Sequence, residues 1–169
     1  SIFEEGFESG NSFTTDTGVV SISSGNGSFP DAPIYASGLQ GLEVRNSTAT
    51  ITSPTINASA YANVALSLRL ASFGGTSGNG TEVSDLVTIS ISTDDGATFS
   101  KELEVTGYSN AKWSFTSGTG EATTIHDGND TATSFAPTAG GNRTTDGYST
   151  LSITGIPSSA TLKIKVDLK

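Results

Sequence analysis

The amino-acid sequence predicts an all-β protein, an antiparallel β-sandwich of jelly-roll type with almost no helix. Three observations support this fold class. Apolar and polar residues alternate with a period of two in several short segments, which is typical of strands with one buried face. Gly, Pro, Asn and Asp residues separate these segments and mark turns. No segment shows a helical period longer than two turns.

The clearest strands lie in the second half of the chain. Leu86–Ile91 alternates and then meets Asp94-Asp95-Gly96, which supplies the positive φ of a tight reversal. Leu103–Val105 follows, so these residues predict a β-hairpin. Val64–Leu70 and Leu162–Leu168 also alternate without interruption. We expect Val64–Leu70, Leu86–Ile91 and Leu162–Leu168 to be central strands.

The remaining predicted strands are shorter. In chain order they are Ile2–Phe7, Val19–Ile22, Leu42–Val44, Ala49–Ile51, Lys112–Phe115, an edge strand near Ser134, and Leu151–Ile153. Ser24–Pro33, Gly74–Gly80 and most of Ser117–Thr150 are rich in turn-forming residues and are predicted to be loops. We expect residues 1–169 to form a single domain that comes from a larger secreted protein.

Composition excludes several classes of function. The net charge of −9, with only eight Lys and Arg residues, argues against nucleic-acid binding. The chain has no Cys, so it has no disulfide, zinc–thiolate site or cysteine nucleophile. No apolar run approaches the roughly 18 residues that a membrane-spanning helix needs. Acidity, the absence of Cys and 71 Ser, Thr and Gly residues together favour a secreted or cell-surface bacterial protein.

Four segments carry a resemblance to a known group of domains. They are Phe3-Glu-Glu-Gly-Phe-Glu-Ser-Gly10, Ile51-Thr-Ser-Pro-Thr-Ile-Asn57, Asp85-Leu-Val-Thr-Ile-Ser-Ile-Ser-Thr-Asp-Asp-Gly96 and Leu151-Ser-Ile-Thr-Gly155. Together they resemble the MAM-like and carbohydrate-binding-module-like jelly-roll domains appended to secreted bacterial proteins. The resemblance implies two antiparallel sheets, pairing of the first and last strands, and a structural calcium near the first strand. The chain lacks the group's usual closing Asp-Asp or Asp-Asn pair, because Leu168 follows Asp167.

Acidic residues at predicted strand ends are candidate calcium ligands. Calcium takes six to eight oxygen ligands, which carboxylates and loop carbonyls can supply. The candidates are Glu8, Glu82, Asp85 and Asp167, and the local segment Asp127-Gly-Asn-Asp130 is an alternative. Exposed acids on a solvated rim would explain the same pattern without a metal.

Aromatic side chains are candidate sugar platforms. Tyr108 and Tyr148 lie in loop-rich stretches, where their rings would be exposed. Trp113 is a third candidate, although its alternation with Ala111 and Phe115 favours burial in the core.

The sequence contains no recognisable catalytic motif. His126 is the only histidine, its neighbours predict a loop, and we expect it to be exposed there. Gly-x-Ser-x-Gly and His-Glu-x-x-His are both absent.

These observations predict a non-catalytic accessory module that binds polysaccharide or a cell-surface glycan. A structural or adhesive spacer that binds no sugar and supports a neighbouring domain of the parent protein, or a partner protein, is the alternative. A small glycan-processing enzyme is a third interpretation, because two carboxylates need only lie about 5–10 Å apart.

Overall fold

The computed structural model of the chain describes residues 1–24, 38–72, 80–113, 120–137 and 147–169. These residues form eleven strands and no helix, so the predicted all-β class is confirmed. The strands are β1 (Thr14–Gly18), β2 (Ser21–Ser23), β3 (Gly41–Glu43), β4 (Ala49–Thr52), β5 (Val64–Arg69), β6 (Leu86–Ser92), β7 (Ser100–Thr106), β8 (Gly120–Ile125), β9 (Thr133–Phe135), β10 (Tyr148–Ile156) and β11 (Lys163–Leu168). Within this part of the chain, no helix is long and apolar enough to cross a membrane.

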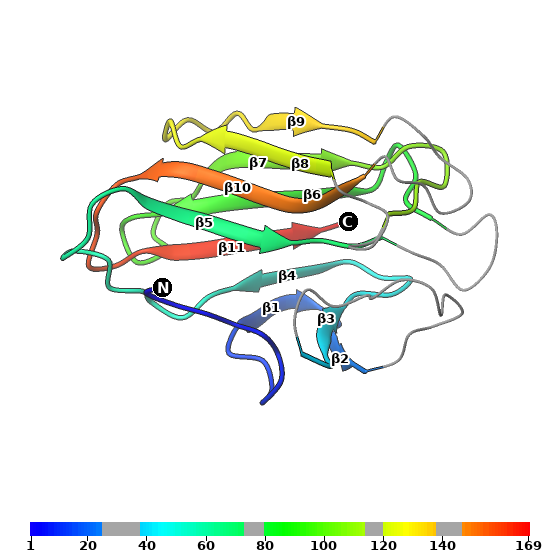
Figure 1. The fold of residues 1–169 in the computed structure, drawn as a ribbon, viewed down its shortest axis with the longest axis horizontal. Helices are drawn as coiled ribbons and strands as arrows, with labels where there is room; N and C mark the ends of the chain where they lie inside the picture. The colour runs from blue at the N-terminus through cyan, green and yellow to red at the C-terminus, as the bar shows by residue number, and fades with distance from the viewer. Residues whose placement is uncertain (25–37, 73–79, 114–119, 138–146) are drawn as a thin grey trace.

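The strands form three sheets. A six-stranded sheet has the order β1-β4-β11-β6-β7-β9, a three-stranded sheet has the order β5-β10-β8, and β2 pairs with β3. The three-stranded sheet lies over the middle of the six-stranded one (Figure 1). Most pairs are antiparallel, as predicted, but β7 with β9 and β8 with β10 are parallel. These parallel pairs arise because the chain crosses from β8 to β9 in the other sheet before it returns as β10.

One hydrophobic core joins the two larger sheets. Ile89, Leu103 and Ile164 contribute to it from the six-stranded sheet. Leu151 and Ile153 contribute from β10 in the facing sheet. All five side chains are buried because alternate residues of each strand point to the same side. The period-two pattern of the sequence therefore marks this shared core, whereas the jelly-roll strand order stays a prediction.

The predicted hairpin is confirmed. β6 and β7 pair antiparallel, and the connection between them has positive φ at Asp95 (62°) and Gly96 (87°). Asp94 stabilises this connection by accepting hydrogen bonds from the amide and the hydroxyl of Thr98, at 2.9 and 2.6 Å. These bonds link the two ends of the turn, and they fix the start of β7 relative to the end of β6.

The N-terminal strand prediction is wrong. Residues 2–7 belong to no strand. The chain bends at Phe7, whose backbone has a positive φ of 60°, and the Glu5 carboxylate holds the bend by accepting hydrogen bonds from the amides of Phe7 and Ser12. The Phe3 and Phe7 rings of this segment pack against Phe13 instead. The first true strand, β1, pairs with β4, which also pairs with β11. First and last strands therefore flank β4 and do not pair with each other.

Strand positions in the sheets differ in part from the prediction. β6 and β11 lie inside the six-stranded sheet as expected, but β5 is an edge strand and β10 is the central strand beside it. The alternation of apolar and polar residues along a strand shows which side chains are buried. It does not show whether the strand has one neighbour or two, so the sequence of β5 could not reveal that it lies at an edge. β9 confirms the edge strand predicted near Ser134.

Other predicted segments lie partly or wholly outside the described residues. They include the predicted loops at 25–33 and 74–79, residues 114–115 of a predicted strand, and 117–119 and 138–146 within the long loop. In the described part of that long loop, β8 was not predicted. Its only buried apolar side chain is Ala122, so its sequence has almost no strand signal.

Candidate functional site

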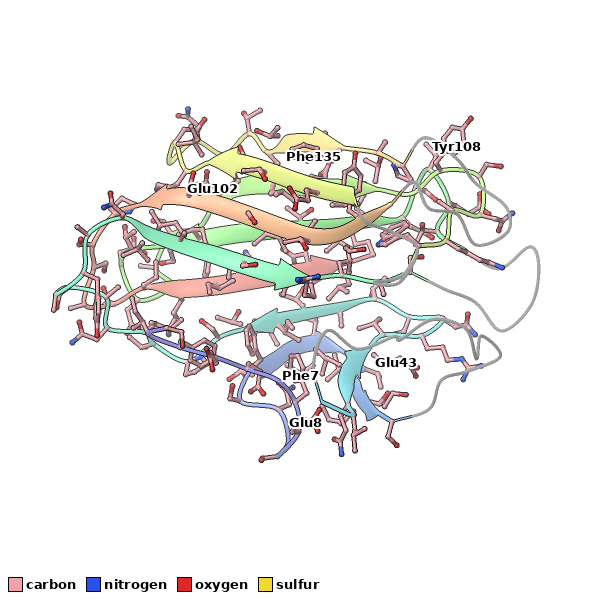
Figure 2. All side chains as sticks on the ribbon, in the orientation of Figure 1. Phe7, Glu8, Glu43, Glu102, Tyr108 and Phe135 are labelled. Atoms are coloured by element: carbon pink, nitrogen blue, oxygen red, sulfur yellow. The ribbon has the colours of Figure 1, made fainter. Side chains whose placement is uncertain are left out.

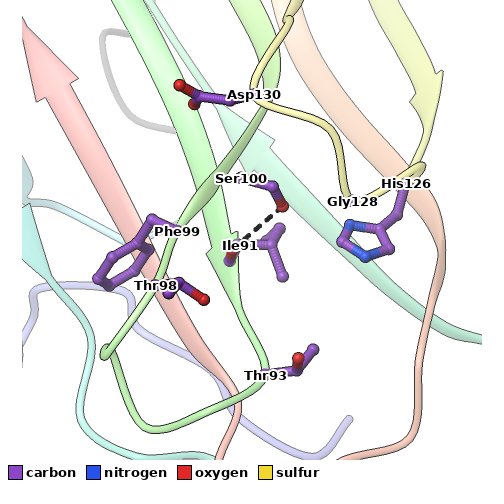
Figure 3. Close-up of a pocket in the computed structure, with 8 residues that line it drawn as sticks. All are labelled: Ile91, Thr93, Thr98, Phe99, Ser100, His126, Gly128 and Asp130. Carbon is purple, nitrogen blue, oxygen red and sulfur yellow. Dashed lines mark hydrogen bonds between the residues drawn. The ribbon is translucent and has the colours of Figure 1, made fainter.

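A pocket of about 200 Å³ lies where the β6–β7 hairpin meets the segment between β8 and β9 (Figure 3). Its lining combines hydroxyl groups, one imidazole, one carboxylate and two apolar side chains. The lining residues are Ile91, Thr93, Thr98, Phe99, Ser100, His126, Gly128 and Asp130. The pocket is smaller than the roughly 300–1,000 Å³ sites of drug-sized molecules, and its groups suit a compact polar ligand.

A β-bulge places a carboxylate beneath this pocket. In the β6–β7 pairing, Ile89 lies opposite Leu103 and Ser90 lies opposite Lys101, so Glu102 is the extra residue. A bulge turns the extra side chain away from the regular alternation. The Glu102 side chain is only 1% exposed. The bulge thus explains how a charged residue of β7 reaches the interior.

Two hydrogen-bond donors and the ring of His126 surround the Glu102 carboxylate. The Ser100 hydroxyl donates to Oε1 at 2.6 Å, and the Asp127 amide donates to Oε2 at 3.1 Å. Nδ1 of His126 is buried and lies 2.6 Å from Oε1, but it makes no aligned hydrogen bond to any of the described residues. Such partners offset the cost of burying a carboxylate.

The order of these groups differs from a catalytic triad. In a triad the histidine lies between the carboxylate and the serine and takes the proton of the serine hydroxyl. Here the carboxylate of Glu102 lies between Ser100 and His126. Because the Ser100 hydroxyl is directed at the carboxylate and not at the imidazole, the arrangement is not a Ser-His-Asp type triad.

The structure corrects the interpretation of His126. It lies in a loop, as predicted, but its side chain is only 11% exposed. Its amide donates to the carbonyl of Thr154 on β10 at 2.8 Å, which draws the loop onto the sheets. Sequence reasoning missed Glu102 altogether, because nothing in the residues around it signals a bulge.

Two lysine side chains contact residues of the pocket lining. The Asp130 carboxylate lies 3.5 Å from the ammonium of Lys101, and Lys165 lies 4.4 Å from the centre of the Phe99 ring.

The hydrogen bonds from the Thr98 hydroxyl, the Thr98 amide and the Ser92 hydroxyl lower the pKa of Asp94 to about 2. The turn that carries Thr98 and Phe99 is therefore tied together by an ionised side chain at neutral pH.

The predicted aromatic platforms do not form one surface. Trp113 is 2% exposed and donates its indole N–H to the carbonyl of Leu70, so its ring offers no free face to a sugar. Tyr148 is half-buried, donates its hydroxyl to the carbonyl of Ala136 and packs edge-on against Phe135. Tyr108 is 46% exposed and lies at the opposite end of β7 from Glu102 (Figure 2).

The predicted calcium ligands Glu8 and Asp167 have different hydrogen-bond partners from the neighbouring pair Glu82 and Asp85. Glu8 accepts from the amides at positions 39 and 40, at 2.9 and 2.8 Å. Asp85 accepts from the amide of its neighbour Glu82, and Asp167 accepts from the hydroxyl of Thr50. No three His, Cys, Asp or Glu side chains in the described ranges form a group that could hold a metal ion. Calcium binding stays a prediction.

Comparison with protein-family models, curated proteins and solved structures finds no match for this chain. The resemblance to MAM-like and carbohydrate-binding jelly-roll domains therefore stays a prediction, and the functional argument depends on the pocket itself.

Proposed function

We propose that this protein is a non-catalytic accessory module of a secreted bacterial protein that binds a polysaccharide or a cell-surface glycan in the pocket above Glu102. The observation that carries the proposal is the lining of this pocket. It places the hydroxyls of Thr93 and Ser100, the imidazole of His126 and the carboxylate of Asp130 beside the Phe99 ring. Sugars present hydroxyl groups that donate and accept hydrogen bonds, and such sites fix a ligand through a few convergent polar groups.

The charge of the protein supports a glycan over other extended ligands. A net charge of −9 repels polyanions such as nucleic acid, whereas neutral polysaccharides carry no opposing charge. Among the described residues, the pocket lining contains no Lys or Arg, and the nearby Lys101 pairs with Asp130 of the lining.

Retention on polysaccharides, followed by calorimetry with oligosaccharides, tests the proposal. Thr93→Trp fills the pocket from an exposed lining position, and Thr48→Trp places the same ring at an exposed position outside the lining. We expect Thr93→Trp to abolish retention and Thr48→Trp to preserve it. Loss of retention in Tyr108→Ala instead would move the site to the other end of the sheets.

The alternative function is a structural or adhesive spacer that binds no sugar. It is favoured by the separation of the aromatic residues, because Trp113 is buried and Tyr148 is half-buried and already hydrogen-bonded. Absence of retention on every polysaccharide, with an intact fold, would support the spacer and refute glycan binding.

A further inference from the structure

Two Asp-Gly sequences lie among the described residues, and their surroundings differ. Asp95-Gly96 forms part of the turn between β6 and β7, whereas Asp127-Gly128 lies in the segment between β8 and β9 that lines the pocket (Figure 3). Glycine has no Cβ to shield its backbone nitrogen. That nitrogen can attack the side-chain carboxyl group of the aspartate before it, so both sequences are candidates for the same backbone rearrangement.

At Asp95-Gly96 both reacting groups are already engaged. The Asp95 carboxylate accepts from the Thr55 hydroxyl at 2.7 Å and lies 3.2 Å from the ammonium of Lys163. These two contacts lower the pKa of the Asp95 carboxyl group. The Gly96 amide donates to the hydroxyl of Ser92 at 2.8 Å. Attack of this nitrogen on Cγ of Asp95 therefore requires several existing contacts to break.

At Asp127-Gly128 the reacting groups are far less engaged. Within the described ranges, the Asp127 carboxylate accepts one hydrogen bond, from the amide of Asn129 at 2.8 Å, and pairs with no basic side chain. The Gly128 amide donates to no other described residue. Both residues are exposed, and a Cβ on Gly128 would meet only Nε2 of His126, at 3.8 Å. The nitrogen and the carboxyl group are thus free to approach each other.

We propose that Asp127 converts spontaneously to isoaspartate in the folded protein, whereas Asp95 is protected. The Gly128 nitrogen forms a bond to Cγ of Asp127, and the hydrogen of this nitrogen leaves with the carboxyl hydroxyl as water, which closes a cyclic imide. Water then adds to one of the two ring carbonyls. Opening at Cγ restores aspartate, whereas opening at the α-carbonyl gives isoaspartate, in which the main chain runs through Cβ and Cγ. One water leaves and one is added, so nothing is oxidised or reduced.

The conversion would alter the candidate site itself. The amide of Asp127 donates to Glu102 at 3.1 Å, which holds the chain in place before the new linkage. After Asp127 the main chain would contain an additional carbon atom and carry a free α-carboxylate beside it. Gly128 and Asp130, which line the pocket beyond this point, would then have to move. Isoaspartate at this position is therefore a modification of the pocket, whatever ligand the pocket binds.

Peptide mapping of the whole protein after prolonged incubation at neutral pH tests the proposal. Mass spectrometry with electron-based fragmentation distinguishes isoaspartate from aspartate at each position. In the folded protein we expect isoaspartate to form roughly tenfold or more faster at Asp127 than at Asp95, because the hydrogen bonds of Asp95 and Gly96 must break first. In urea, where these bonds are lost, the two rates should be similar. An equal or faster rate at Asp95 in the folded protein would overturn the proposal, as would absence of isoaspartate at Asp127 when the unfolded protein forms it.

Two variants test the reason for the difference. Thr55→Val removes an exposed hydroxyl that holds Asp95, and Thr48→Val is the matched control at an exposed position without this contact. We expect Thr55→Val to raise the rate at Asp95 and to leave the rate at Asp127 unchanged, whereas Thr48→Val should change neither rate. If Thr55→Val does not change the rate at Asp95, the contacts of Asp95 do not protect it and the structural explanation is wrong.

Discussion

Replacing Glu102 by Ala should destabilise the protein strongly. The change removes a buried carboxylate that accepts from Ser100 and Asp127 and lies 2.6 Å from His126. The change leaves the Ser100 hydroxyl and the Asp127 amide without their carboxylate acceptor. A buried donor left unsatisfied costs about 1–3 kcal/mol, so the two together should cost about 2–6 kcal/mol. Glu102→Gln keeps an acceptor of the same shape but loses the charge, so its cost should fall to about 0.5–1.5 kcal/mol, the range of one ordinary hydrogen bond.

Urea denaturation of the wild type and both variants measures these costs. In a thermal melt, domains of 150–250 residues lose about 2–4 °C of melting temperature per kcal/mol, so Glu102→Ala should melt roughly 4–24 °C below the wild type. Glu121→Ala is the matched control, because Glu121 is exposed on the neighbouring β8, and such surface changes stay within about 0.5 kcal/mol. If Glu102→Ala unfolds as close to the wild type as this control does, the buried carboxylate contributes nothing and the account of the site fails.

Three further predictions concern the turn, a close backbone contact and calcium. The pKa of Asp94 is lowered from 3.8 to about 2 in the folded protein, so its stabilising effect is present above pH 3.8 and is lost as the pH falls toward about 2; the stability difference between the wild type and Asp94→Ala should shrink over this range, and a constant difference would contradict it. Gly107→Ala should cost about 1–3 kcal/mol, because its Cβ would lie 1.8 Å from the carbonyl oxygen of Glu82, whereas Gly6→Ala meets only a flexible side chain at 3.9 Å and should be neutral in the same denaturation assay. Calcium binding predicts that EDTA lowers the melting temperature by several degrees, that calcium restores it better than magnesium, and that Asp85→Ala abolishes this response; an unchanged melting curve in EDTA would exclude calcium.

Local patterns in the sequence determined the fold class and most of the core. Alternation in Leu86–Ile91 and Leu162–Leu168 identified two strands that the structure places inside the large sheet. Asp94-Asp95-Gly96 identified the hairpin. These predictions succeed because side-chain alternation and positive φ are properties of the residues themselves.

Tertiary structure alone decided the candidate site. Glu102 reaches the interior, next to Ser100 and His126 of the pocket lining, because β7 has one more residue than β6 opposite it, and the register between two strands cannot be read from one of them. His126 is partly buried because the loop after β8 bonds to β10 and meets Glu102. The same limit applies to β5, an edge strand whose alternation resembles that of a central one. Alternation depends on which side chains face the core, whereas a site depends on which strands become neighbours, and that is decided only when distant parts of the chain pack together.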